Sequence, residues 1–234
     1  MRLRVATYNI RKCVGTDWRR RPDRILAVLS EIGADLAALQ EADRRFGTRA
    51  STLPAGLLAE AGWTPAPIAP HVDGLGWRGN ALLLGPRARL IAAEPIELPH
   101  VEPRGAVLAE VALDGTDIRV IGMHLGLTPP DRTRQARAVL GALTRRPPLP
   151  TVLMGDLNEP RQRGGPLRLL AAAHRLAPAT PTYHAEFPFA ALDRIATSPE
   201  LRLAASAAHR SPLARRASDH LPLWADLDLP GDAP

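Results

Sequence analysis

Residues 151–158 read Thr-Val-Leu-Met-Gly-Asp-Leu-Asn, a short apolar run that ends in two polar side chains. An apolar run of this length, closed by a glycine, is typical of a buried strand. Asp156 and Asn158 then lie at the carboxyl end of that strand. Taken alone, each is best interpreted as a turn residue or a helix cap, so a function depends on what the other strands carry.

Polar side chains occupy the ends of several other predicted strands. Strands are predicted over residues 3–10, 35–40 and 118–125, and a last one over 221–229. The polar residues at their ends are Asn9, Glu41, His124, Asp219 and His220. Polar groups at strand ends can converge on one mouth of a layered sheet, although the spacing alone does not prove that they meet.

The remaining pattern alternates strands with amphipathic helices. Helices are predicted over residues 22–32, 53–61, 131–143 and 166–175, and further strands over 80–84, 104–113 and 192–197. Asp114-Gly115 has the composition of a hairpin turn. The proline-rich stretches 65–70 and 178–188 are predicted to be surface loops. This mixture predicts one α/β domain over residues 1–234, with two sheets packed together and helices outside.

Composition limits the classes of protein. No run of eighteen apolar residues is present, so an integral membrane segment is not expected, and the N-terminus lacks the pattern of a signal peptide. The single cysteine, Cys13, rules out an internal disulfide and agrees with a cytoplasmic location. The net charge of +6 favours a phosphate-bearing partner. However, arginine supplies all but one of the cations, a bias typical of a high-GC genome.

The acidic residues favour a particular metal. Carboxylate oxygens are hard ligands that suit Mg²⁺, whereas a structural zinc site needs a cluster of Cys or His that this chain lacks.

Seven segments together resemble the endonuclease/exonuclease/phosphatase superfamily. They are residues 7–10 (Thr-Tyr-Asn-Ile), 39–41 (Leu-Gln-Glu), 78–81 (Arg-Gly-Asn-Ala), 123–125 (Met-His-Leu), 155–158 (Gly-Asp-Leu-Asn), 192–195 (Leu-Asp-Arg-Ile) and 218–222 (Ser-Asp-His-Leu-Pro). The resemblance covers nearly the whole chain and is closest to small, single-domain bacterial members. It implies a DNase-like four-layer α/β sandwich, in which two mixed β-sheets pack face to face with helices outside.

The resemblance also implies a metal site. Glu41 would bind Mg²⁺ directly, with Mn²⁺ as a possible substitute. Asn9 would support the metal directly or through water, and Asp219 would hold a metal-bound water or a second cation. An acidic residue two positions after Asn9 is typical of abasic-site endonucleases, but here that position is Arg11, which argues against a second metal there.

The same resemblance implies catalytic roles. Asp156 would position or deprotonate the attacking water, and Asn158 would donate to a phosphoryl oxygen. His220, oriented by Asp193, would contact the phosphate or transfer a proton. His124 would protonate the leaving oxygen or bind phosphate, and its presence instead of a Tyr argues against abasic-site repair.

Three further residues are candidates for binding substrate. Arg78 and Asn80 lie in a matching segment, Arg104 lies in residues 102–105 (Glu-Pro-Arg-Gly), and arginines can grip phosphate with two hydrogen bonds. The alternative, that the two arginines are ordinary loop residues of an arginine-rich protein, is equally open. Trp18 and Trp77 could stack a base or touch lipid, but packing on their own loops is preferred.

The sequence therefore predicts a Mg²⁺-dependent hydrolase of phosphodiester bonds. Its substrate would be nucleic acid, a phospholipid or a small diester, and no protein partner is implied. A phosphomonoesterase is the first alternative. A binding protein that has lost catalysis on the same fold is the alternative from another class, although Asp156, Asn158 and His220 are all retained.

Overall fold

The first β-sheet is built around the N-terminal strand of the chain. In the computed structural model, which describes residues 1–44, 47–99 and 102–229, this sheet has six strands in the order β11-β12-β1-β2-β4-β3. Their bounds are β1 Arg2–Asn9, β2 Leu36–Gln40, β3 Thr64–Pro65, β4 Ala81–Leu84, β11 Arg202–Ala208 and β12 Leu223–Asp228. Because β1 runs parallel to β2 and antiparallel to β12, the sheet is mixed.

A second mixed sheet is formed mostly by the middle of the chain. Within the described residues it has six strands in the order β5-β6-β7-β8-β10-β9. Their bounds are β5 Ala88–Glu97, β6 Gly105–Leu113, β7 Thr116–His124, β8 Thr151–Asp156, β9 Arg175–Leu176 and β10 Asp193–Thr197. The strands β7 and β8 are parallel, so His124 and Asp156, which pair in register, lie at the same edge.

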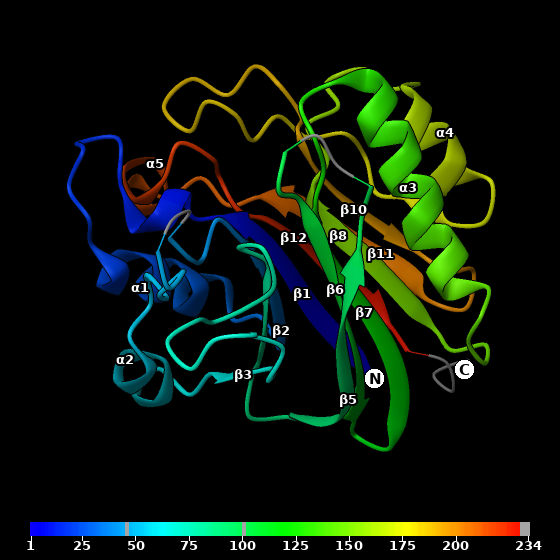
Figure 1. Cartoon of the computed structure of the whole chain (residues 1–234), viewed down its shortest axis with the longest axis horizontal. Helices are drawn as coiled ribbons and strands as arrows, with labels where there is room; N and C mark the ends of the chain where they lie inside the picture. Colours follow the sequence, from blue (N-terminus) through cyan, green and yellow to red (C-terminus); the bar gives the residue numbers. More distant parts are fainter. Residues whose placement is uncertain (45–46, 100–101, 230–234) are drawn as a thin grey trace.

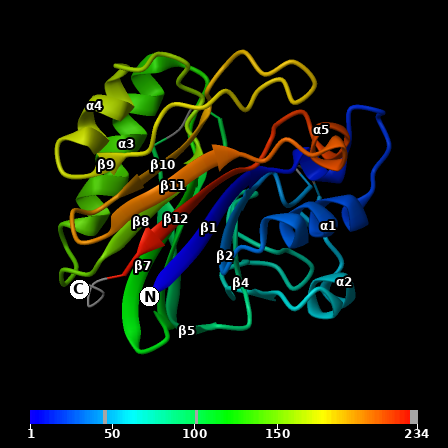
Figure 2. The ribbon, with the colours of Figure 1, turned by 180° about the vertical axis from the view of Figure 1, so that it is seen from behind.

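The two sheets pack face to face, with helices on both outer surfaces (Figures 1 and 2). Alternate residues of each strand point inward, and Val5 and Leu36 of the first sheet share a buried core with Val107 and Val152 of the second. Helices α1 (Pro22–Ile32), α2 (Ala55–Glu60) and α5 (Pro212–Ala217) cover the first sheet, and α3 (Pro129–Leu143) and α4 (Gly165–Ala171) cover the second. The predicted four-layer α/β sandwich is confirmed.

Helix α1 shows how local sequence sets an element. Pro22 occupies the first turn, where its missing N–H removes no helical hydrogen bond. Gly33 closes the helix in the left-handed conformation (φ 65°), and its N–H bonds to the carbonyl of Leu29. The residues at helical spacing, from Ile25 to Ile32, are buried against the first sheet.

Several predicted boundaries were wrong. The helix predicted over residues 166–175 ends at Ala171, and Arg175 begins the short strand β9. The strands β5 and β11 and the helix α5 were not predicted. Both strands are largely exposed edge strands, so they lack the alternation of apolar and polar residues that a half-buried strand shows. Helix α5 has only six residues, too few to establish helical periodicity.

None of the helices in the described ranges is both long and apolar enough to cross a membrane.

The packing of the two sheets depends on a small residue at their centre. A Cβ atom added to Gly122 of β7 would lie 3.0 Å from Cβ of Ala38 and 3.2 Å from Cγ2 of Val107. We therefore expect Gly122→Val to lower the free energy of unfolding by about 1–3 kcal/mol, because the sheets must separate to admit it. Urea unfolding followed by circular dichroism measures this change.

The matched control is Gly141→Ala in helix α3, where the nearest atom to the added Cβ is 3.7 Å away. Alanine there raises stability by roughly 0.5–1 kcal/mol, because glycine is a poor helix former. Equal stability of Gly122→Val and the wild type would contradict the close packing inferred here.

Candidate active site

Asp156, the last residue of β8, is the centre of a buried polar cluster that joins the two sheets. Its side chain is almost completely buried. Nδ2 of Asn9, at the end of β1 in the first sheet, donates to Oδ2 of Asp156 over 3.0 Å. The backbone N–H of Asn158 donates to Oδ1 over 2.9 Å. The structure thus brings together residues that lie 147 positions apart in the chain.

Two imidazoles approach the same carboxylate oxygen. Nε2 of His124 lies 3.4 Å from Oδ2 of Asp156, and Nε2 of His220 lies 3.8 Å from it. Both rings are buried. The spacing in the sequence left open whether these strand-end side chains meet, and the structure places His124, Asp156 and His220 together.

His220 is held by Asp193, the first residue of β10. Nδ1 of His220 lies 2.8 Å from Oδ2 of Asp193, which also accepts a hydrogen bond from Oγ1 of Thr182 over 2.6 Å. Burial disfavours the imidazolium, but the charges of Asp193 and Asp156 outweigh it and raise the pKa of His220 to about 10. His220 is therefore protonated at neutral pH, with Nε2 directed toward the centre.

His124 has the opposite electrostatic balance. Burial is the largest effect, and the nearby Arg104 adds to it against the opposing charge of Asp156, so the pKa of His124 falls to about 3. Nη1 of Arg104 lies 2.7 Å from Nε2 and 2.9 Å from Nδ1 of the ring. A neutral His124 can form hydrogen bonds but carries no extra proton, which favours the role in binding phosphate over protonation of the leaving oxygen.

Asn158 is fixed at the rim of the cluster. It adopts the left-handed conformation (φ 51°), which Asn tolerates better than most residues. Its Nδ2 donates to the carbonyl of Leu125 over 2.9 Å. One amide hydrogen is thereby used, and the second is free to serve a ligand.

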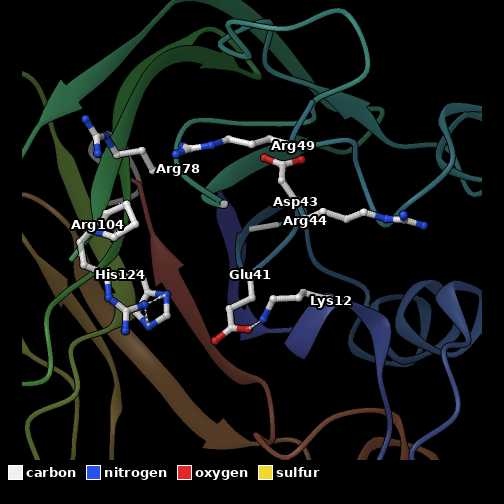
Figure 3. A pocket seen from close by; sticks show the side chains of 10 residues that line it. Lys12, Glu41, Asp43, Arg44, Arg49, Arg78, Arg104 and His124 are labelled. Atoms are coloured by element: carbon white, nitrogen blue, oxygen red, sulfur yellow. Dashed lines mark hydrogen bonds and ion pairs between the residues drawn. The ribbon is translucent and has the colours of Figure 1, made fainter. Parts of the chain in front are cut away.

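Glu41 follows β2 and lies opposite His124 across a pocket (Figure 3). Its backbone is also left-handed (φ 54°). The Oε2 atom forms an ion pair with Nζ of Lys12, a residue that the sequence analysis did not single out. Lys12 is the only lysine of the chain and follows a motif segment by two residues, a signal that could have identified it.

The segment around His220 is tied to the end of β1. Oγ of Ser218 donates to the carbonyl of Asn9 over 2.7 Å, a role that sequence reasoning missed although Ser218 belongs to a matching segment. Asp219 is half-buried, and its Oδ2 lies 3.5 Å from Nε of Arg11. Arg11 stands at the position where abasic-site endonucleases carry an acidic residue. Here it is a cationic neighbour of Asp219.

Arg78 lines the pocket, and Asn80 follows it by two residues behind the lining. Nδ2 of Asn80 donates to the carbonyl of Gly105 over 3.0 Å, so this fully buried side chain holds two strands together. Nη2 of Arg78 pairs with Glu97 over 3.2 Å, and its guanidinium lies over the ring of Trp77. Asn80 therefore supports the pocket only indirectly, through its hydrogen bond to Gly105, whereas Arg78 lines the pocket itself.

The two tryptophans differ. Trp77 packs against the core between the sheets, whereas packing on its own loop was preferred from the sequence. Trp18 is 78% exposed, so the packing preferred for it from the sequence was wrong. The guanidinium of Arg11 lies over its ring, 4.4 Å from the ring centre.

A metal ion would find oxygen donors here. Among the described residues, Asp156, Asp193 and His220 form a buried group whose possible ligand atoms lie within 4.8 Å of one another. Oδ1 of Asp193 is buried without a hydrogen-bond partner, so this group could hold a metal ion. Glu41 lies outside this group, but its half-buried carboxylate lines the adjoining pocket and offers the oxygen ligands that a hard divalent ion prefers.

The whole arrangement matches a known family. The model of the Endonuclease/Exonuclease/phosphatase family matches residues 6–220. The chain belongs to this family. Its members are phosphoric ester hydrolases and generally depend on a divalent metal, so the protein is an enzyme of this class.

Solved structures agree with this assignment. An endonuclease/exonuclease/phosphatase from Beutenbergia cavernae is 26% identical with a TM-score of 0.74, covering 98% of this chain and 72% of the other. D. rerio TDP2 complexed with single strand DNA product is 18% identical with a TM-score of 0.73, covering 97% and 99%. A mannosyl-6-phosphatase from Bacteroides thetaiotaomicron is 17% identical with a TM-score of 0.74, covering 97% and 100%. No curated protein sequence matches the chain significantly.

The charge of His220 can be tested directly. In the wild type, we expect the ring of His220 to stay protonated throughout the neutral range. Burial lowers the pKa of His220, and the charge of Asp193 is the largest effect that raises it. Asp193→Asn removes that charge, so the pKa of His220 must fall and the ring titrates at lower pH. NMR titration of the histidine ring protons measures both values.

The control is Asp226→Asn, which removes a buried carboxylate paired with Arg4, away from His220. It should leave the titration of His220 unchanged. A wild-type His220 that titrates near its ordinary value of 6.5 would refute the electrostatic description.

Proposed function

We propose that the protein hydrolyses phosphodiester bonds with Mg²⁺, by attack of a water molecule at the Asp156 centre. The observation that carries this proposal is the placement of one buried carboxylate, Asp156, between the amide of Asn9, the neutral ring of His124 and the protonated ring of His220. Such a centre offers a proton acceptor and a proton donor 3.8 Å apart. Phosphoryl transfer requires both, together with neutralisation of charge.

Each residue has a proposed task. Asp156 orients the attacking water and accepts its proton, while Asn9 fixes the carboxylate in place. His220 directs its Nε2–H at a phosphoryl oxygen or at the leaving oxygen, because Asp193 occupies Nδ1. Asn158 donates its remaining amide hydrogen to a phosphoryl oxygen.

The other candidates would serve binding. His124 would bind the phosphate at the edge of the centre, and its hydrogen-bonding partner Arg104 would bind an anionic group of the substrate in the adjoining pocket. Arg78 lines the same pocket and would add a second guanidinium. Asn80 would act indirectly, by fixing the wall that carries Arg78.

We propose Glu41 as the principal ligand for Mg²⁺, with Asn9 and Asp219 in support and Mn²⁺ as a substitute. A bound divalent ion neutralises charge on phosphoryl oxygens and lowers the pKa of nearby water. Glu41 lines the open pocket beside the centre and is not fully buried, so a hydrated ion can reach it. By contrast, Asp193 and His220 are already bonded to each other, and a protonated imidazole is a poor ligand.

Nucleic acid, a phospholipid or a small diester remains the proposed substrate class. A phosphomonoester is the second candidate, and the protonated ring of His220 at the centre favours it, because a terminal phosphate carries more charge than a diester. We also propose that residues 1–234 act as one domain, since both sheets contribute to the centre. A cytoplasmic location agrees with the buried free thiol of Cys13.

Metal removal tests the dependence on Mg²⁺. We expect the purified protein to hydrolyse bis-p-nitrophenyl phosphate in the presence of Mg²⁺, faster than it hydrolyses p-nitrophenyl phosphate. EDTA should abolish turnover, and Mg²⁺ or Mn²⁺ should restore it. Faster hydrolysis of the monoester would favour the second candidate, and turnover that survives EDTA would exclude a required dissociable metal.

Substitution of the central residues tests the assignment of the site. Asp156→Asn and His220→Ala should each lower kcat/KM by at least about 100-fold, the usual contribution of a proton-transfer group. The thermal transition should stay close to that of the wild type for Asp156→Asn, which keeps the shape of the side chain. Asp117→Asn, on an exposed position of β7, is the matched control and should keep full activity. Full turnover by both variants of the centre would refute the assignment.

A further inference from the structure

A cationic pocket extends outward from the reaction centre on the side of Glu41 (Figure 3). Its volume is about 100 Å³, and it is open to solvent on one side. The described residues that line it are Lys12, Glu41, Asp43, Arg44, Arg49, Arg78, Gly79, Pro103, Arg104 and His124. Five cationic side chains thus meet two carboxylates, so the pocket favours an anion.

The two carboxylates are already engaged. Asp43 is buried and accepts hydrogen bonds from the backbone N–H groups of Leu75 and Gly76, over 2.8 Å and 3.2 Å. Glu41 is paired with Lys12. Neither acid therefore neutralises the arginines of the pocket by direct contact.

Arg49 is the least engaged of these arginines that face the pocket. Figure 3 shows its side chain extending across the pocket toward Arg78, whereas Arg44 points away. Within the part of the chain that the structure describes, the guanidinium of Arg49 makes no hydrogen bond or ion pair and acts on Asp43 only through its charge. Because the guanidinium of Arg49 has no such partner, all of its N–H groups can donate to an anion in the pocket.

The neighbouring arginines also keep unused donors. Nε of Arg78 and Nε of Arg104 are buried without a hydrogen-bond partner, although other nitrogens of both side chains contact acidic residues. Guanidinium groups match the geometry of phosphate oxygens. The wall of the pocket thus offers N–H groups from three arginines.

This pocket adjoins the proposed position of the scissile phosphate but does not include it. Asp156, Asn158 and His220 do not line it, whereas Glu41 and His124 lie at the boundary between the pocket and the reaction centre. No Phe, Tyr or Trp is among the described residues of its lining, so it lacks a surface for stacking a base.

We propose that the pocket binds a second phosphate group of the substrate, with Arg49 as the residue that selects for it together with Arg78 and Arg104. This inference rests on the proposed phosphoester hydrolysis at Asp156 and narrows its substrate class. The accepted substrates carry a second phosphate group in addition to the scissile one. That second phosphate comes either from the adjacent position of a polynucleotide or from a small bisphosphorylated metabolite.

Binding of simple anions tests the pocket without turnover. Isothermal titration calorimetry with inorganic pyrophosphate and with inorganic phosphate, in the absence of divalent metal, compares a double anion with a single one. We expect pyrophosphate to bind at least about tenfold more tightly, since one charge-assisted hydrogen bond contributes about that factor. Arg49→Gln should remove most of this preference, Arg49→Lys should keep part of it, and binding of inorganic phosphate should change less than about twofold.

The control is Arg145→Gln, which removes an exposed arginine just beyond helix α3. It should leave both affinities unchanged, and circular dichroism of each variant verifies folding. Equal affinity for the two anions in the wild type, or an unchanged preference in folded Arg49→Gln, would overturn the inference.

Two substrate pairs then distinguish the sources of the second phosphate. A thymidine dinucleotide with a 5′-terminal phosphate is compared with the same dinucleotide without it, and fructose 1,6-bisphosphate is compared with fructose 6-phosphate. The pair whose kcat/KM ratio falls in Arg49→Gln identifies the source, and an unchanged ratio in both pairs contradicts the inference. If the wild type hydrolysed none of these substrates but still bound pyrophosphate more tightly than phosphate, that result would instead refute the proposed catalytic function.

Discussion

The hydrogen bond from Asn9 to Asp156 joins the end of a strand in one sheet to the end of a strand in the other. Removing a carboxylate from water is costly unless polar neighbours compensate it. Asp156 is almost fully buried, and the backbone of Asn158 and the rings of His124 and His220 gather around it as well. The packing of the two sheets and the chemistry of the site therefore depend on the same carboxylate, and a change in the sheet packing would alter the reaction centre.

The architecture was predictable because its physical causes are local. Alternating apolar residues identified β1, and the proline and glycine at the ends of α1 set its limits. The missed elements lack such local causes. The residues of β5 alternate little in polarity because this edge strand is largely exposed, and it forms a strand only because β6 pairs with it. Tertiary pairing, which a short window of sequence does not contain, decides such segments.

The candidate site was predictable in its residue types and less so in its contacts. Family resemblance named Asp156, His220 and Asp193, and the structure brings them within hydrogen-bonding or ion-pairing reach. The sequence could not indicate that the side-chain amide of Asn80 donates to the backbone carbonyl of Gly105, because that contact depends on how two distant strands meet. For the same reason it did not identify Lys12 beside Glu41 or Arg49 in the pocket, whose roles come from the shape of loops between the strands.

The two histidines beside Asp156 differ in protonation, so only His220 carries an extra proton that it can donate. His220 is charged because Asp193 supports it, whereas His124 is neutral because burial and Arg104 disfavour its charge. A crystal structure of the protein with inorganic phosphate and Mg²⁺ tests this account most directly. The account predicts a phosphate oxygen within hydrogen-bonding distance of Nε2 of His220, with the ion at Glu41. A phosphate bound elsewhere, with the Asp156 centre left empty, would contradict it.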